Sequence, residues 1–452
     1  MRFFEQVQIT VLDNGFTVVT DYFPGHPKAA ASLVLASGGF HDPLDQLGCA
    51  HFMEHMLTHA HPEMNQLAFN RMLKRKAIRG NVTTGKDNIQ AFAEARCDSV
   101  QEFMDVVARM FVSGSFTRPQ VEHERQPIVD EMEEEHNSRE QIATRARLKA
   151  IYGDAARATL PVGGDPEHLK RITYEQLQHF WHDNVVGKNM MYVSAGGISH
   201  EDNVVFCAQH FGHLKPGYRR PRFGGKLMMR DFKFPMPERQ DDRVYMNIMF
   251  DASQAFANPM VKPKLELVES YFQTALSEDI RFRGGQLYDI GAQIVPFNNS
   301  TQGVLAIAAN CHPDNYGKQL VAIRSSLHDI MGGDQRHREA FELSRESIGN
   351  IVAEHAADLA ESMSMRRQRI IDSLLKVGKL PDVKAEQANL MATTFEEATA
   401  VIRDIIHACV PVVDHRGHID DQQLTGAQMG KFLGLKGRAL IPAGSAPRVA
   451  VA

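Results

Sequence analysis

The chain has 452 residues, a formal net charge of −5 at pH 7, 43% hydrophobic residues and 23% charged residues. A chain of this length exceeds what one hydrophobic core usually organises, so we expect more than one domain. The mildly acidic charge argues against nucleic acid or an anionic membrane as the main partner, because neither attracts a negative surface.

Apolar runs in the sequence stay well short of the roughly 20 residues that span a bilayer. The five cysteines are scattered and odd in number, which fits a reducing compartment better than a disulfide framework. Residues 1–5 read MRFFE, and this early acid is not typical of a signal peptide. We therefore expect a cytoplasmic protein, unless a presequence was removed before residue 1. For Cys49 we expect the role of a small buried side chain, with redox sensitivity as the alternative.

The first half of the chain predicts short strands and longer helices in alternation. Asp13-Asn14-Gly15 between two apolar runs is a strong hairpin signal. The predicted strands are 8–12, 16–20, 29–36, 88–95 and 190–195, and the predicted helices are 46–59, 62–77, 100–112, 119–152, 173–182 and 200–213. Pro127 lies within one of these helices and is expected to bend or interrupt it.

The helix predicted at 46–59 carries the motif H-x-x-E-H. His51 and His55 are four residues apart and share one face, so their ring nitrogens can bind a tetrahedral zinc ion. Glu54 projects toward the same region, where it can accept a proton from a water whose pKa zinc has lowered to roughly 7. The alternative is a solvated helix face, since the chain has 21 histidines. We expect that plain role for four others: His59, His61, His210 and His213.

A third ligand is predicted in the acidic stretch 122–135, because a catalytic zinc needs three protein ligands and one open position. Glu124 and Glu131 lie two helical turns apart on one face. One of them can bind zinc, while the other accepts a hydrogen bond from a histidine ligand and so fixes the orientation of its ring. For residues 133–135, which are all glutamate, we expect a solvated helix face.

Residues 215–226, KPGYRRPRFGGK, predict a linker because they are rich in proline, glycine and arginine. The order of elements then begins again, with strands at 229–234, 243–250, 292–297, 303–309 and 408–413 and helices at 261–280, 314–331, 336–377 and 394–407. This is a duplication in element order, which predicts domains at 1–214 and 227–452. The second domain lacks H-x-x-E-H, so the first is expected to hold the metal.

With these motifs the chain resembles the family of pitrilysin, insulin-degrading enzyme and mitochondrial processing peptidase. Its signature is H-x-x-E-H followed some seventy-odd residues later by E-x6-E, here Glu124 to Glu131. The resemblance covers nearly the whole chain. It implies that His51, His55 and Glu131 bind one zinc ion per chain. It further implies that Glu54 is the general base and that the Glu124 carboxylate fixes the orientation of a histidine ligand without binding the zinc itself. Residues 57–62, LTHAHP, replace the family's aromatic-x-Gly-Thr run, a departure that bears on the neighbouring pocket and on substrate preference.

The resemblance also implies a substrate-binding edge strand at 79–85, RGNVTTG. Such an edge offers unpaired backbone groups to an extended peptide. Asn81 matches the family's substrate-contacting asparagine, and Val82 and Thr83 follow it. The alternative for Asn81 is an ordinary position in a hairpin turn.

In the second domain the family has an arginine and a tyrosine seven residues apart, matched here by Arg281 and Tyr288. By resemblance they hold the substrate backbone and stabilise a developing oxyanion. Arg283 is the rival for the arginine role. Taken alone, the two residues would be an exposed arginine and a half-buried tyrosine at a turn.

Together these features imply an α+β fold of two tandem homologous α/β-sandwich domains that form half of a clamshell chamber. The implied function is a zinc metalloendopeptidase that acts on peptides or unfolded segments, as a homodimer or as a heterodimer with an inactive homologous chain. One alternative is a maturation protease for a single precursor peptide. Another is a non-catalytic scaffold or assembly subunit, which the presence of the complete motif disfavours. Cobalt or manganese instead of zinc stays open, because affinity order alone does not decide occupancy.

Overall fold

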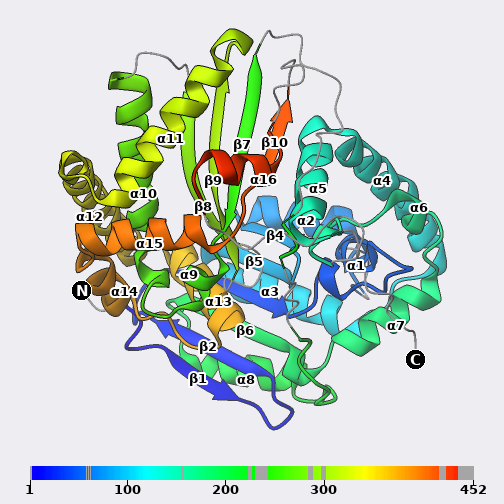
Figure 1. Ribbon diagram of the computed structural model, residues 1–452. Coiled ribbons are helices and arrows are strands. Elements are labelled where there is room, and N and C mark those ends of the chain that lie inside the picture. Colours follow the sequence, from blue (N-terminus) through cyan, green and yellow to red (C-terminus); the bar gives the residue numbers. More distant parts are fainter. Residues whose placement is uncertain are drawn as a thin grey trace. The chain divides into compact units, whose positions relative to one another are not determined.

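The computed structural model describes residues 3–57, 59, 61, 63–153, 157–221, 227–229, 243–283, 289–296, 302–416 and 424–435. The chain divides into two compact units (Figure 1). The first comprises residues 1–138, 160–223 and 355–383, and the second comprises 139–159, 224–354 and 384–452. Compared with the predicted domains 1–214 and 227–452, residues 139–159 group with the second unit and residues 355–383 with the first.

The first unit is built on a six-stranded sheet with the order β1-β2-β6-β3-β5-β4. Its strands are β1 (Gln8–Val11), β2 (Thr17–Tyr22), β3 (Lys28–Leu35), β4 (Arg79–Thr84), β5 (Ile89–Arg96) and β6 (Met190–Gly196). β2 and β6 run parallel, and the other neighbours are antiparallel. The predicted first hairpin is confirmed, and Gly15 occupies its turn with a positive φ of 87°, which glycine adopts without steric cost.

Both faces of this sheet are covered, because neighbouring strand residues point to opposite sides. Val18 packs into the core formed with helices α1 (Cys49–Leu57), α3 (Cys97–Ser113) and α4 (Arg118–Asn137). Val19 packs on the other side against Ile370 and Ile371 of helix α13 (Met363–Val377). The remaining helices of this unit are α2 (Gln66–Arg75), α6 (Pro166–Leu169), α7 (Tyr174–Asn184) and α8 (His200–Phe211).

The helix predicted at 119–152 is two helices, and it is not interrupted at Pro127. α4 continues through Pro127, and the break falls at Ser138, whose backbone is extended. α5 (Arg139–Tyr152) follows. Proline removes one backbone N–H from a helix, but the buried Val121 anchors α4 before that point, and the buried Ile128, Val129 and Met132 anchor it after that point.

The second unit contains a four-stranded antiparallel sheet with the order β10-β7-β9-β8. Its strands are β7 (Val244–Asp251), β8 (Asp289–Pro296), β9 (Gly303–Cys311) and β10 (Val412–Arg416). The strand predicted at 229–234 lies outside the described residues from 230 onward. The helices of the second half are α9 (Ser253–Ala257), α10 (Leu265–Ser277), α11 (Tyr316–Gly332), α12 (Arg338–Glu361), α14 (Val383–Met391), α15 (Phe395–Ala408) and α16 (Gly426–Phe432).

The helix predicted at 336–377 is also divided, into α12 and α13. Ser362 caps the second of these, with its side chain accepting a hydrogen bond from the backbone N–H of Met365, and such a cap favours a new helix start. Of the helices that the structure describes, none has both the length and the apolar character needed to cross a membrane.

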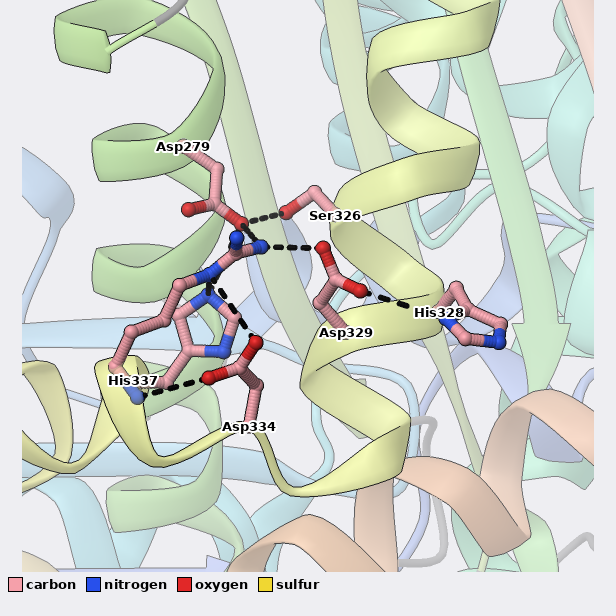
Figure 2. Close-up of polar contacts among 7 residues, drawn as sticks. Asp279, Ser326, His328, Asp329, Asp334 and His337 are labelled. Carbon is pink, nitrogen blue, oxygen red and sulfur yellow. Dashed lines mark hydrogen bonds and ion pairs between the residues drawn. The ribbon is translucent and has the colours of Figure 1, made fainter.

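A buried polar cluster joins three elements of the second unit (Figure 2). Asp279, in the π-helix Glu278–Arg283, accepts a hydrogen bond from the Ser326 hydroxyl of α11 at 2.7 Å and lies 3.0 Å from Nε2 of the fully buried His337. Burial acts to raise the pKa of Asp279, but the hydrogen bonds with His337 and Ser326 outweigh it and lower that pKa. The cluster therefore fixes the π-helix against α11 and against the 3-10 turn Gln335–His337 that precedes α12.

The burial of His415 in β10 leads us to expect that the stability of the second unit depends on pH. Its Nε2 lies 2.8 Å from the Tyr316 hydroxyl, and burial lowers its pKa from 6.5 to about 4. As the pH falls below about 6.5, the His415 ring takes up a proton in the unfolded chain. In the folded chain it does so only near pH 4, so protonation favours the unfolded chain between these values. We expect the second unit to lose roughly 3 kcal/mol of stability as the pH falls from 6.5 to 4.

The measurement is the urea midpoint of unfolding at pH 7 and at pH 4.5, for the wild type and for His415→Gln. We expect the difference between the two pH values to shrink in His415→Gln. The matched control is His407→Gln, at an exposed position of α15. An unchanged pH dependence in His415→Gln would contradict the prediction.

Candidate metal centre

Helices α1 and α4 bring His51, His55 and Glu131 together. Within the described part of the chain, these form the one group of at least three potential ligand side chains whose atoms converge, all within 4.8 Å of one another. Nε2 of His51 lies 3.9 Å from Oε1 of Glu131, and Nε2 of His55 lies 3.6 Å from its Oε2. Ligand atoms around a tetrahedral zinc stand about 3.3 Å apart, so small side-chain adjustments would let this group hold the ion.

The surroundings favour the neutral, metal-binding form of His51. Burial lowers the pKa of this ring, and the neighbouring His55 lowers it further, whereas Glu131 acts to raise it. A metal-binding histidine must be neutral, so this direction suits a ligand. Gly163 allows the close packing here, because a Cβ on it would lie 2.1 Å from Sδ of Met132 and 3.3 Å from Nδ1 of His51.

The side chain of Glu54 extends from α1 toward Thr84 of the edge strand β4. Burial raises the pKa of its carboxyl group, while hydrogen bonds from the side chain and backbone of Thr84 oppose this shift. Thr84 is the last residue of β4, and its hydroxyl also lies 3.4 Å from the Ala50 carbonyl oxygen of α1. The strand end therefore holds the carboxyl group that the motif assigns as the base.

Glu124 lies behind the histidines and contacts two of them. Its Oε2 is 3.5 Å from Nδ1 of His55, and its Oε1 is 3.0 Å from Nε2 of His59. The expectation of a solvated face was wrong for His59, whose side chain is only 14% exposed. It was also wrong for His210, which is equally buried and pairs with Asp105 at 3.1 Å. The i, i+4, i+8 spacing of His51, His55 and His59 was the available signal for His59.

The predicted substrate residues of the first domain lie in β4, an edge strand of the sheet. Asn81 lies within β4 and pairs with Phe92 of β5, so the alternative of a hairpin turn for Asn81 is wrong. Asn81 and Thr83 are exposed, whereas Val82 is buried in the core. Any contact of Val82 with a peptide must therefore come through its backbone.

The arginine and tyrosine predicted in the second domain are placed only in part. Arg281 is exposed in the π-helix Glu278–Arg283, with its guanidinium 5.5 Å from the ring centre of Phe282. Tyr288 lies outside the described residues, as does the side chain of Arg283. The Asp279 cluster holds the π-helix two residues before Arg281.

Comparison with known families gives two matches along the chain. Residues 17–160 match the model of insulinase, peptidase family M16, and residues 171–343 match the model of the peptidase M16 inactive domain. The first range includes the whole converging group. The second begins before the linker and extends into the half that lacks H-x-x-E-H.

Curated relatives are distant in sequence. A protein named probable mitochondrial-processing peptidase subunit beta, from Schizosaccharomyces pombe, is 27% identical over 242 residues, which are 51% of this chain and 52% of the relative. The match thus spans about half the length of that relative. An uncharacterized zinc protease of Mycobacterium bovis is 22% identical over 408 residues, covering 88% of this chain and 90% of the relative.

Solved structures share the fold. The periplasmic protease PqqL of Escherichia coli superposes with a TM-score of 0.79 at 14% identity, covering all of this chain and 53% of that one. The first half of the same protease gives a TM-score of 0.78, with 98% and 99% of the two chains covered. A protease from Helicobacter pylori gives a TM-score of 0.72 at 15% identity.

Proposed function

Because the chain belongs to the insulinase family, peptidase family M16, we propose that it is a zinc-dependent endopeptidase. The observation that carries this proposal is the convergence of the ligand atoms of His51, His55 and Glu131 within 4.8 Å of one another. Glu54 lies on α1, the helix that carries both histidines. Relatives named zinc proteases support it. The proposed substrates are peptides or unfolded protein segments.

His51, His55 and Glu131 would hold the ion, and their neutral imidazoles and carboxylate suit zinc. When bound, zinc supplies a Lewis acid that polarises a carbonyl group and lowers the pKa of water. Glu54 accepts the proton of the attacking water and afterwards donates it to the leaving amine. The hydrogen bonds from Thr84 keep its carboxyl group in place.

Substrate binding is proposed at β4. An extended peptide can add to this edge as a further strand, because an edge strand offers unpaired backbone groups. Asn81 and Thr83 are exposed along it and are proposed to contact the peptide. Arg281 and Tyr288 of the second half are proposed to hold the substrate backbone and to stabilise the oxyanion.

We further propose that two chains form a chamber around the substrate. Support comes from the chain matching 53% of the Escherichia coli protease and nearly the whole of its first half, and from a relative named a subunit. The proposed assembly is a homodimer, and a heterodimer with an inactive homologous chain is the alternative. Sedimentation of the purified chain distinguishes a dimer from a lone chain. The proposed compartment is the cytoplasm, supported by five free cysteines and testable by cell fractionation.

Removal of the metal tests the proposed function. We expect one zinc per chain, cleavage of an unstructured peptide, loss of cleavage after chelation and its return when zinc is added. Zinc at about 1,000 times its dissociation constant should raise the free energy of unfolding by about 4 kcal/mol, because only the folded chain presents the three ligands together. The measurements are metal analysis, peptide cleavage and thermal unfolding with and without zinc.

The possible outcomes separate the alternatives. A chain that binds no metal contradicts the peptidase and favours a scaffold. A chain that binds zinc but cuts no random peptide favours a dedicated maturation protease or a missing partner chain. Offering peptides encoded nearby in the genome then distinguishes these two.

A further inference from the structure

The segment after helix α1 places a third histidine close to the proposed metal site. α1 ends at Leu57, and the backbone N–H of His59 donates to the Met56 carbonyl oxygen at 3.0 Å, which continues the turn. This turn directs the His59 ring toward α4, where its Nε2 lies 3.0 Å from Oε1 of Glu124. The side chains of His59 and Glu124 are only 14% and 13% exposed, so water competes little for this contact.

Glu124 uses one carboxylate oxygen for each histidine. Oε1 contacts His59, and Oε2 lies 3.5 Å from Nδ1 of His55. The other nitrogen of His55, Nε2, faces Glu131 at 3.6 Å and is the atom that would bind the ion. With the ion on Nε2 that nitrogen would carry no proton, so the proton would sit on Nδ1. There it would face Oε2 of Glu124, 3.5 Å away.

Glu124 alone would hold His55 poorly, because a glutamate side chain has several rotatable bonds and freezing them costs entropy. A donor on the second oxygen fixes the carboxylate plane and so directs the first oxygen at Nδ1 of His55. His59 is that donor. His59 itself lies outside the converging group of ligand atoms, so it acts through Glu124 and does not bind the ion.

We propose that His59 is a positioning residue, which holds Glu124 in the orientation that presents Nε2 of His55 to the metal. The proposal rests on the proposed function, because it assumes that His55 binds zinc. It also explains the 57–62 segment, LTHAHP, in part: the departure from the usual family run supplies an anchor for Glu124.

The test is the dissociation constant for zinc, measured by competition with a coloured chelator. We expect His59→Leu to weaken zinc binding about 10-fold or more, the usual effect of removing a group that orients a ligand. His59→Gln keeps an N–H donor that reaches Glu124 and should stay within about threefold of the wild type. The matched control is His123→Leu, an exposed histidine next to Glu124 in sequence, which should leave the constant unchanged.

A double-variant cycle shows whether His59 acts through Glu124. In the Glu124→Gln background, replacement of His59 should weaken zinc binding no further, because the carboxylate that it orients is already gone. An equal additional loss in that background overturns the proposal. If His59→Leu does not fold, His59→Asn takes its place, since its shorter amide does not reach Glu124.

Unfolding of the metal-free variants separates positioning from simple stabilisation. If His59→Leu lowers the unfolding midpoint of the metal-free chain but binds zinc as the wild type does, His59 only stabilises the end of α1 and the proposal is wrong. If the wild type binds zinc and His59→Leu binds it equally well, this inference fails while the proposed function stands. If the wild type binds no zinc, both fail.

Discussion

Replacement of Glu54 by glutamine should reduce peptide cleavage about 10²- to 10⁴-fold, the usual contribution of a general base. Glutamine has nearly the shape of glutamate but cannot accept the proton of the attacking water. His51, His55 and Glu131 are unchanged in this variant, so we expect it to retain one zinc per chain. The measurement is kcat/KM for an unstructured peptide together with zinc content.

The matched control for this variant is Glu134→Gln, an exposed glutamate on α4, which should cleave as the wild type does. Glu54→Gln that keeps more than about a tenth of the wild-type activity would show that Glu54 is not the base. A variant that loses its zinc together with its activity would show instead that Glu54 holds the site together.

Replacement of Arg366 by methionine should lower the stability of the first unit by about 3 to 5 kcal/mol, because it leaves a buried carboxylate without its partner. The side chain of Arg366 is 1% exposed, and Asp21 of β2 is fully buried. Nε of Arg366 donates to Oδ2 of Asp21 at 2.5 Å, and its other nitrogens donate to the carbonyl oxygens of Leu359 and Phe3.

The aromatic rings around Arg366 add to this anchor. Its guanidinium lies 4.8 Å from the ring centres of both Phe4 and Phe23, a distance at which a cation is attracted to the ring face. Gln6 supplies a further donor, with Nε2 at 3.0 Å from Oδ1 of Asp21. The pair thus joins the N-terminal residues, β2 and α13 in one buried network.

Urea unfolding of the first unit measures this effect, and two variants complete the experiment. Asp21→Leu combined with Arg366→Met removes both charges and should recover part of the lost stability, since no unpaired buried charge remains. Lys376→Met removes an exposed charge that pairs with Asp372 on the same helix and should change stability by less than about 1 kcal/mol. A loss below about 1 kcal/mol for Arg366→Met would contradict the prediction.

The elements were predicted best where the signal is local. The Asn14-Gly15 turn, the strands of the first sheet and α1 depend on turn chemistry and on apolar spacing over a few residues. The divided helices were missed because the deciding signals are weak in sequence: Ser138 and Ser362 end or cap helices that apolar spacing alone would continue. Proline usually disrupts a helix interior, but α4 continues through Pro127 because its buried face packs against the core.

The candidate site follows the same division. The sequence alone determined that His51, Glu54 and His55 share one region, because a helix places residues three and four apart side by side. It determined equally that Glu124 and Glu131 share a face of α4. The resemblance then named Glu131 as the third ligand.

Only the tertiary structure decided which distant residues meet. His59 contacts Glu124 across 65 residues, and Arg366 reaches Asp21 across 345. The Asp279 cluster likewise joins residues 47 to 58 positions apart. Such contacts depend on how whole helices pack, and packing is set by the summed burial of many side chains. A local pattern can therefore specify the chemistry of a residue, whereas its partner is known only once the chain has folded.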